Sequence, residues 1–303
     1  MTTNPNARQR IVAIACLLGG MAVVGSYVAL SKPLVAVIPV FILAGLRFSI
    51  AGVFMAGWLK PDAQAAPLNG SVRMALFVQS LLGNFLFSIC MLYGVLYSSA
   101  TTAGIVMAGI PAAVALLSWA WLRERIGARM GVAIALSVAA VSSLHWGGTG
   151  SAGLGGTHQT IGIALLLGAV FCEASYVVLA KRLSGHVSPR RNSAILNAIG
   201  WALMLPLALW QWQSTGFQLA SITLPQWLLL GYYALAASVI STVLWFTGLR
   251  HVPANQAGVY TVALPIAAAG LGVGVLGEVF TAWHALALGL AVAGVVCASW
   301  QKT

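Results

Sequence analysis

The sequence has very few charged residues, and acidic residues are the scarcest of them. Only 6% of its 303 residues are charged, and only four are Asp or Glu. Soluble globular domains carry about 25% charged residues, so this composition excludes a water-soluble fold. A polytopic membrane enzyme acting on lipid is also disfavoured, because it would need His, Asp or Glu clustered at one membrane face. The acidic residues instead stand far apart, at Asp62, Glu124, Glu173 and Glu278.

Paired cysteines and motifs for metals or nucleotides are also missing. The four cysteines fall singly in four different apolar stretches and are most simply core residues: Cys16, Cys90, Cys172 and Cys297. Gly272, Gly274 and Gly277 match the spacing of a dinucleotide motif, but they lie in an apolar stretch, where small residues let helices approach closely. No metal and no bound cofactor are expected.

Apolar residues make up 60% of the chain and gather in ten long stretches. A helix rises ~1.5 Å per residue and needs ~20 residues to cross ~30 Å of hydrocarbon. The sequence therefore predicts an all-α integral membrane protein with ten transmembrane helices. These cover approximately residues 11–30, 37–58, 73–97, 103–122, 127–146, 159–180, 193–212, 226–249, 255–277 and 282–300.

Basic residues are distributed unevenly over the predicted loops. With a cytoplasmic N-terminus, the outside receives only Lys32, Arg47 lies within a span, and the inside receives all the other Lys and Arg residues. Cytoplasmic loops of membrane proteins are enriched in Lys and Arg, so both termini are expected in the cytoplasm. The net charge of +11 follows from this bias and indicates contact with anionic lipid rather than with nucleic acid.

The second half of the chain repeats the first. Residues 26–32 and 175–181 agree at five of seven positions, and a shift of 154 positions pairs Gly94 with Gly248, Pro111 with Pro265 and Glu124 with Glu278. Five spans per half would place the two copies in opposite orientations, which is typical of secondary transporters. We expect one five-helix repeat over 1–146, an external linker over 147–158, and an inverted repeat over 159–303.

The paired prolines indicate a hinge. Pro111 and Pro265 fall in the middles of the fourth and ninth predicted spans, where proline removes a backbone hydrogen bond. Paired helix breaks point to the centre of a transporter. We interpret these prolines, with Gly104 and Gly258, as hinge residues; the alternative is an ordinary kink held by packing.

Two ionisable residues lie well inside predicted spans, where a lipid-facing charge would cost roughly 2.5–3.5 kcal/mol. Arg47 is expected to bind carbonyls of a broken neighbouring helix. Glu173 is expected to face a central cavity, where it would meet a substrate ammonium group, carry a proton or pair with Arg47. Glu124 and Glu278 lie at span ends and are expected to cap the helices that follow them.

Neutral polar residues complete the predicted substrate site. Any one of them could instead join two helices through a hydrogen bond. An apolar lining with scattered hydrogen-bonding groups suits small zwitterions, whereas polyanions would need several central cations and only Arg47 is available. The candidate substrate-binding residues are Gln79, Asn84, Glu173, Asn197, Trp201 and Tyr260.

Three segments carry a family resemblance: Val-Gly-Ser-Tyr-Val-Ala-Leu-Ser-Lys at 24–32, Gly-Leu-Arg-Phe at 45–48, and Pro111 followed by Leu-Arg-Glu-Arg at 122–125. They resemble the drug/metabolite transporter superfamily and its EamA-type ten-helix exporters, above all the bacterial aromatic amino acid exporters. Such exporters commonly have tryptophan where this chain has Val24.

The resemblance implies a ten-helix bundle with a central cavity in the bacterial inner membrane. It would export amino acids and related metabolites by alternating access. We expect the chain to act as a monomer. The alternatives are an exporter of other metabolites or of cationic drugs, and a polytopic membrane enzyme.

Overall fold

The structure, a computed structural model, describes residues 7–60, 69–123, 127–146, 156–183, 187–249, 251–252 and 258–299. Within these ranges every regular element is a helix. Asp62, Glu124 and residues 147–155 of the expected linker lie outside the described residues.

The first half of the chain forms seven α-helices, two of which are joined by a π-helical segment, η2. In chain order the elements are α1 (Ala7–Val35), α2 (Val40–Met55), the 3₁₀ turn η1 (Ala56–Leu59), α3 (Gly70–Ser80), η2 (Leu81–Leu86), α4 (Phe87–Tyr97), α5 (Ala100–Met107), α6 (Ile110–Leu122) and α7 (Ala128–Trp146).

The second half has the same kinds of element in a similar order, again with one π-helical segment, η4. The elements are α8 (Gly156–Leu183), α9 (Pro189–Thr215), the 3₁₀ turn η3 (Leu219–Ser221), α10 (Leu224–Leu235), η4 (Ala236–Ile240), α11 (Ser241–Leu249), the 3₁₀ segment η5 (Gly258–Val262), α13 (Ala263–Gly274) and α14 (Ala282–Ser299).

Eight helical stretches in the described residues are long and apolar enough to cross a membrane. They include the composite stretches Gly70–Tyr97, Ala100–Trp121 and Leu224–Leu249. Two shorter apolar helices, Ala128–Leu144 and Gly258–Gly274, fall where the sequence predicts the fifth and ninth spans. The chain is therefore a multi-pass, all-helical membrane protein.

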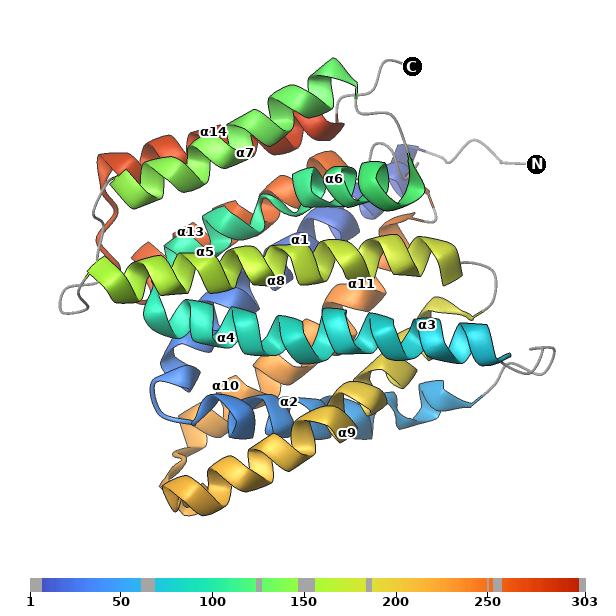
Figure 1. The fold of residues 1–303 in the computed structure, drawn as a ribbon, viewed down its shortest axis with the longest axis vertical. Helices are drawn as coiled ribbons and strands as arrows, with labels where there is room; N and C mark the ends of the chain where they lie inside the picture. Colours follow the sequence, from blue (N-terminus) through green and yellow to red (C-terminus); the bar gives the residue numbers. More distant parts are fainter. Residues whose placement is uncertain are drawn as a thin grey trace.

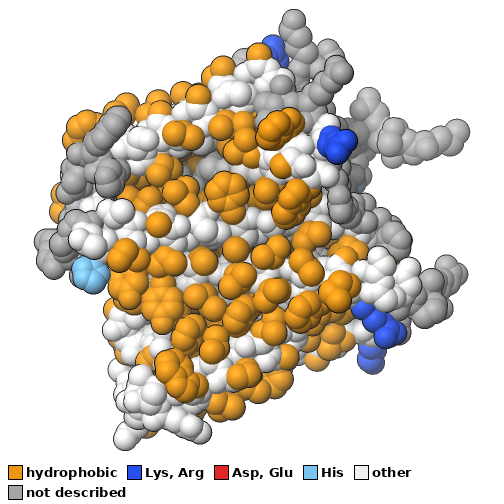
Figure 2. Space-filling view, viewed as in Figure 1, with side chains coloured by type: hydrophobic (Ala, Val, Ile, Leu, Met, Phe, Trp, Pro, Cys, Tyr) orange, Lys and Arg blue, Asp and Glu red, His pale blue; other side chains and the backbone are white. Residues whose placement is uncertain are grey.

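The helices lie side by side in one bundle, and both chain termini emerge at the same end of it (Figure 1). Helices of the first half pack along helices of the second: α7 on α14, α4 on α8, α2 on α9, α1 on α11 and α13, and α5 on α13. Apolar side chains cover most of the face shown in Figure 2, and the Lys and Arg side chains visible there lie at the end that carries the termini.

The fourth expected span is broken rather than kinked. Helix α5 ends at Met107 and α6 begins at Ile110, with Gly109 as its N-cap residue. Pro111 is therefore in the first turn of α6, where the missing N–H is one that no helix carbonyl would have bound. Pro265 similarly lies in the first turn of α13, after η5. The sequence predicted that each proline removes a bond within a continuous helix, and the structure places each proline just after a change in the helix.

Candidate functional site

A pocket opens between the start of α9 and the end of α11, and it has a volume of about 490 Å³. Both of these helix ends lie at the end of the bundle that carries the chain termini (Figure 1). The wall combines apolar side chains with hydroxyl groups and one cation. The lining residues are Ser188, Pro189, Arg190, Thr242, Val243, Phe246, Thr247 and Leu249.

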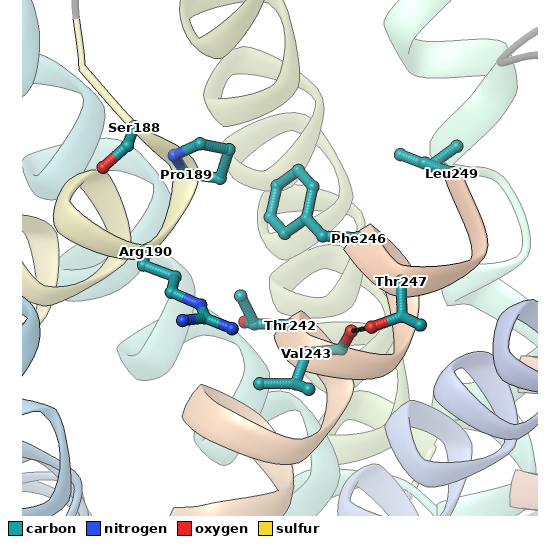
Figure 3. A pocket seen from close by; sticks show the side chains of 8 residues that line it. All are labelled: Ser188, Pro189, Arg190, Thr242, Val243, Phe246, Thr247 and Leu249. Atoms are coloured by element: carbon teal, nitrogen blue, oxygen red, sulfur yellow. Dashed lines mark hydrogen bonds between the residues drawn. The ribbon is translucent and has the colours of Figure 1, made fainter. Parts of the chain in front are cut away.

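Arg190 supplies the positive charge of this pocket. Figure 3 shows its side chain reaching from the first turn of α9 towards Thr242 on α11. Its guanidinium carbon also lies 6.0 Å from the ring centre of Trp58, which is a cation–π contact. The hydroxyl of Thr242 donates to the carbonyl of Ser238 in η4, and that of Thr247 donates to the carbonyl of Val243 in α11. Arg190 is therefore the polar group of the wall best placed to reach a bound molecule.

Deeper in the bundle, five polar residues from five helices form a central polar cluster: Tyr27, Arg47, Ser88, Glu173 and Tyr233. Tyr27 interacts electrostatically with Glu173, Arg47 and Tyr233. The rings of Tyr27 and Tyr233 meet edge to face, with centres 5.8 Å apart. The cluster thus connects α1, α2, α4, α8 and α10.

Glu173 is half-buried on α8. Its carboxylate lies near the hydroxyls of Tyr27 and Tyr176, and the structure shows no hydrogen bond from it to another described residue. No salt bridge joins it to Arg47, which the structure also describes, so the expected pairing of these two charges is not present. Glu173 therefore keeps its oxygens free for a proton or a cationic group.

Arg47 is buried on α2 and is connected to the π-helical segment η2 through the side chain of Ser88. Its Nη2 donates to Ser88 Oγ at 3.1 Å, and Ser88 Oγ donates to the carbonyl of Asn84 in η2 at 2.6 Å. The guanidinium also lies over the rings of Phe48 and Tyr233, at 4.2 and 5.8 Å from the ring centres. The sequence predicted a direct contact with helix carbonyls, but a serine mediates it.

The other predicted substrate-binding residues lie apart from the central polar cluster or join helices. Gln79 Nε2 donates to the carbonyl of Tyr176, and Asn197 Nδ2 donates to the carbonyl of Phe48. Their side-chain oxygens are buried without a partner. Trp201 donates to Ser49 Oγ at 2.9 Å. These contacts connect α3 with α8 and α9 with α2.

Asn84 and Tyr260 have different surroundings. Asn84 is half-buried in η2, and a Cβ placed on Gly200 would come 3.0 Å from its Cβ. It is the candidate closest in the chain to Ser88. Tyr260 packs with Ala13, Leu17 and Val252 at the end of the bundle that carries the termini. Of the six candidates, the structure therefore brings Glu173 into the central polar cluster and Asn84 next to it.

The predicted hinge glycines are points of close helix contact. A Cβ on Gly104 of α5 would collide with Ala268 of α13, and a Cβ on Gly258 would come 2.8 Å from Ser299 Oγ. The absence of a side chain at Gly104 allows α5 and α13 to cross closely. Both glycines therefore lie next to the helix breaks near Pro111 and Pro265, in closely packed surroundings.

A charged clamp, formed by Lys32 and Glu278, holds the turn between α4 and α5 at the opposite end of the bundle. Lys32 Nζ donates to the carbonyls of Val95 (2.7 Å), Leu96 (3.2 Å) and Ser98. Glu278 accepts from the amides of Ala100 (2.6 Å) and Thr101 (2.8 Å) and from Thr101 Oγ1 (2.7 Å). A cation at a helix C-terminus and an anion at an N-terminus both complement the helix dipole.

Glu278 caps α5, whereas the sequence predicted that it caps the following helix, α14. The preceding residue Gly277 has φ of +67°, a left-handed conformation that glycine adopts easily, and this turn redirects the chain after α13. The backbone of Glu278 donates to the carbonyl of Gly272 at 2.9 Å. Sequence reasoning missed the clamp, because its partners are 63 to 178 residues apart. The available signal was the lone external lysine, Lys32.

Comparisons with known proteins agree with this architecture. The model of the EamA-like transporter family matches residues 11–145 and again residues 160–300. The uncharacterized transporter YetK of Bacillus subtilis (strain 168) is 35% identical over 289 residues, which cover 95% of this chain and 87% of that protein. A second uncharacterized transporter of that organism, YvbV, is 24% identical over 78% of this chain and 75% of its own length.

A solved crystal structure has the same fold, with a TM-score of 0.63, 18% sequence identity, and coverage of 97% of this chain and 96% of the other. The two family matches together span nearly all of the described helices. This chain is therefore a membrane transporter and belongs to the EamA-like transporter family.

Proposed function

We propose that this protein is a secondary transporter that exports amino acids, including aromatic and apolar ones, and related small metabolites across the bacterial inner membrane by alternating access. The observation that carries the proposal is the difference between the two ends of the bundle. One end has a pocket of about 490 Å³, and the opposite end is held together by the Lys32–Glu278 clamp. With the termini in the cytoplasm, this arrangement is open inwards, ready to load an exported substrate.

A helix contact that occurs in both halves of the chain supports a duplicated architecture. Helix α1 packs on α11 as α8 packs on α4. Leu17 of α1 meets Gly248 of α11, and Leu166 of α8 meets Gly94 of α4. Leu17 and Leu166 are separated by the same interval as the repeated segments at 26–32 and 175–181, and Gly94 pairs with Gly248 in the repeat. One packing contact therefore occurs once in each half.

The direction of the repeated helices supports inversion. Both repeated segments end near the C-terminus of a long helix, Lys32 in α1 and Lys181 in α8. Those two C-termini lie at opposite ends of the bundle (Figure 1). Inverted repeats, related by a pseudo-two-fold axis in the membrane plane, give a transporter two conformations that open to opposite sides around one central site. We place that site between the pocket and the central polar cluster.

The charged groups at the pocket and in the central polar cluster favour a small zwitterion as the substrate. Arg190 offers a cation for a carboxylate at the pocket, and Glu173 offers an anion for an ammonium group deeper inside. Tyr27 and Tyr176 supply aromatic rings next to Glu173, suited to apolar and aromatic side chains. A polyanion would meet only one deep cation, Arg47. We propose that the protein transports its substrate as a monomer and without a cofactor.

Counterflow in proteoliposomes tests the proposal. Vesicles loaded with individual amino acids would be assayed for uptake of the same labelled amino acid, with phenylalanine and leucine expected to exchange and glucose 6-phosphate expected not to. Thr242→Trp should fill the pocket and stop exchange. Leu228→Trp, at a position that is 67% exposed on α10, is the matched control and should exchange normally.

Two results would contradict the proposal. Exchange of a quaternary ammonium drug without any exchange of amino acids would assign the path to cationic drugs. Normal exchange by Thr242→Trp would show that substrates do not pass through this pocket.

A further inference from the structure

Two of the four cysteines meet at the seam between α4 and α8. The side chains of Cys90 on α4 and Cys172 on α8 are neighbours that interact with each other. The Sγ of Cys90 also lies 3.4 Å from the position that a Cβ on Gly168 would take. Gly168 and Cys172 are one helical turn apart and therefore share a face of α8. The thiol of Cys90 thus lies against the face of α8 that carries Cys172, although the sequence suggests four separate core cysteines.

The register of the two helices brings these thiols towards each other. Going back along α4 and η2 from Tyr97 to Gly94 to Gly83, the neighbours on α8 are Gly162, Leu166 and Tyr176, so α8 runs antiparallel to α4. Each Cα–Cβ bond in a helix tilts towards the N-terminus of its own helix. Because the helices are antiparallel, Cys90 tilts towards Cys172 and Cys172 tilts back towards Cys90. This is the approach that a disulfide requires.

The surroundings determine which oxidants can reach the pair. Both cysteines are half-buried and lie within membrane spans, Gly70–Tyr97 and Thr157–Ala180. Phe171, next to Cys172, is 46% exposed. Helices α4 and α8 lie side by side on the face drawn in Figures 1 and 2, whose surface is largely apolar. A lipid-soluble oxidant therefore has access to this seam from the bilayer.

We propose that Cys90 and Cys172 form a reversible disulfide that joins α4 to α8 when a lipid-soluble quinone oxidises them. Two S–H bonds break and one S–S bond forms, while two electrons and two protons pass to the quinone and produce the hydroquinone. Thiol–disulfide exchange with a dithiol restores both thiols.

The bond would connect the two halves of the transporter. Cys90 lies in the first segment matched by the family model and Cys172 in the second. This consequence rests on the proposed function: if transport requires the halves to move relative to each other, the disulfide stops transport in the oxidised state. The pair is then a redox-sensitive lock in the membrane interior.

A split-chain gel assay tests the bond without any transport measurement. A protease site inserted at Gly150 allows the two halves to be cut apart after full-length protein in liposomes has been treated with a short-chain ubiquinone. The halves should migrate together on a non-reducing gel and separate after reduction. Cys90→Ser and Cys172→Ser should separate under both conditions, whereas the control with Cys16→Ser and Cys297→Ser should remain joined. Separation of the wild-type halves without reductant would overturn the proposal.

Counterflow in the same vesicles tests the lock. Oxidised wild type should lose exchange and regain it with a membrane-permeant dithiol, while the Cys90→Ser variant should be insensitive to the quinone. Cross-linked protein that still exchanges at the full rate would refute the lock. Protein that cross-links but exchanges no amino acid in the reduced state would refute the proposed function and leave the disulfide site supported.

Discussion

At the residue scale, the Lys32–Glu278 clamp stabilises the turn between α4 and α5, at the end of the bundle opposite the chain termini. Lys32 and Glu278 also interact electrostatically with each other. Each satisfies backbone groups that a helix end leaves without partners, three carbonyls for Lys32 and two amides for Glu278. The clamp therefore stabilises one tight turn, Ser98–Ser99, from both sides.

Replacing Glu278 should destabilise the protein measurably. Glu278→Ala leaves the amides of Ala100 and Thr101 without an acceptor, which should lower the free energy of unfolding by ~1–3 kcal/mol. Gly277→Ala should act in the same direction, because φ of +67° disfavours a side chain. Thermal unfolding in detergent, followed by tryptophan fluorescence, measures both effects.

Gly270→Ala is the matched control for the glycine variant. A Cβ at Gly270 would meet nothing within 4 Å, and its backbone is helical, so its melting temperature should stay at or above the wild-type value. Equal melting temperatures for Glu278→Ala and wild type would show that the clamp contributes nothing to stability.

Glu173 is the residue through which any proton linkage should run. It is the one carboxylate among the described residues that lies in the middle of a span, and no hydrogen bond holds its oxygens. Glu173→Gln should leave downhill exchange working and remove its response to an imposed pH gradient. The measurement is substrate flux in proteoliposomes with and without the gradient, with Glu278→Gln as the control carboxylate.

Two outcomes would decide against this role. A gradient effect that survives Glu173→Gln would exclude Glu173 as the coupling site. Wild-type flux that ignores the gradient would identify the protein as a facilitator that equilibrates its substrate.

At the element scale, irregular helix segments occur at matching places in the two halves. The π-helical segments η2 and η4 begin at Leu81 and Ala236, close to the interval of 154 that relates the repeated halves. The breaks before Pro111 and Pro265 match in the same way. π-Helical turns are frequent at functional sites, and local breaks let a packed helix bend. These segments are the places where we expect the bundle to deform during transport.

Removing the prolines should slow transport more than it weakens substrate binding. Alanine at 111 or 265 restores an N–H and allows a continuous, stiffer helix across the break, so the conformational step should slow while the dissociation constant stays near the wild-type value. Exchange rates and equilibrium binding, measured on the same preparation, separate the two effects. Pro225→Ala is the control, because Pro225 lies in the first turn of α10 at a span end. Unchanged turnover in both hinge variants would assign the prolines to static packing.

At the scale of the whole molecule, the bundle has one strongly basic end and one end with few charges. The Lys and Arg side chains visible in Figure 2 lie at the end of the bundle where both termini emerge (Figures 1 and 2). Lys32 is the one lysine or arginine of the described residues that lies at the other end, and its ammonium group donates to helix carbonyls. From this distribution we predict that the basic end lies in the cytoplasm.

Cysteine labelling of intact cells checks this orientation. In a background without the four native cysteines, Val37→Cys, which follows α1 at a position that is 42% exposed, should react with an impermeant maleimide. Leu59→Cys, 43% exposed in η1 at the basic end, should react only after the membrane is permeabilised. Labelling of Leu59→Cys in intact cells would reverse the predicted topology.

The sequence by itself determined that the chain is a membrane protein, the approximate positions of its spans and its internal repeat. These properties depend on local composition and on the comparison of one segment with another. It also identified Glu173 and Arg47 as costly charges in the membrane. Only the tertiary structure decided which groups these residues contact: Ser88 for Arg47 and tyrosines for Glu173. It likewise decided that Glu278 caps α5 and that Cys90 lies next to Cys172. Such contacts join residues far apart in the chain, and many helix rotations satisfy the same hydropathy pattern, so the packing of the bundle selects among them.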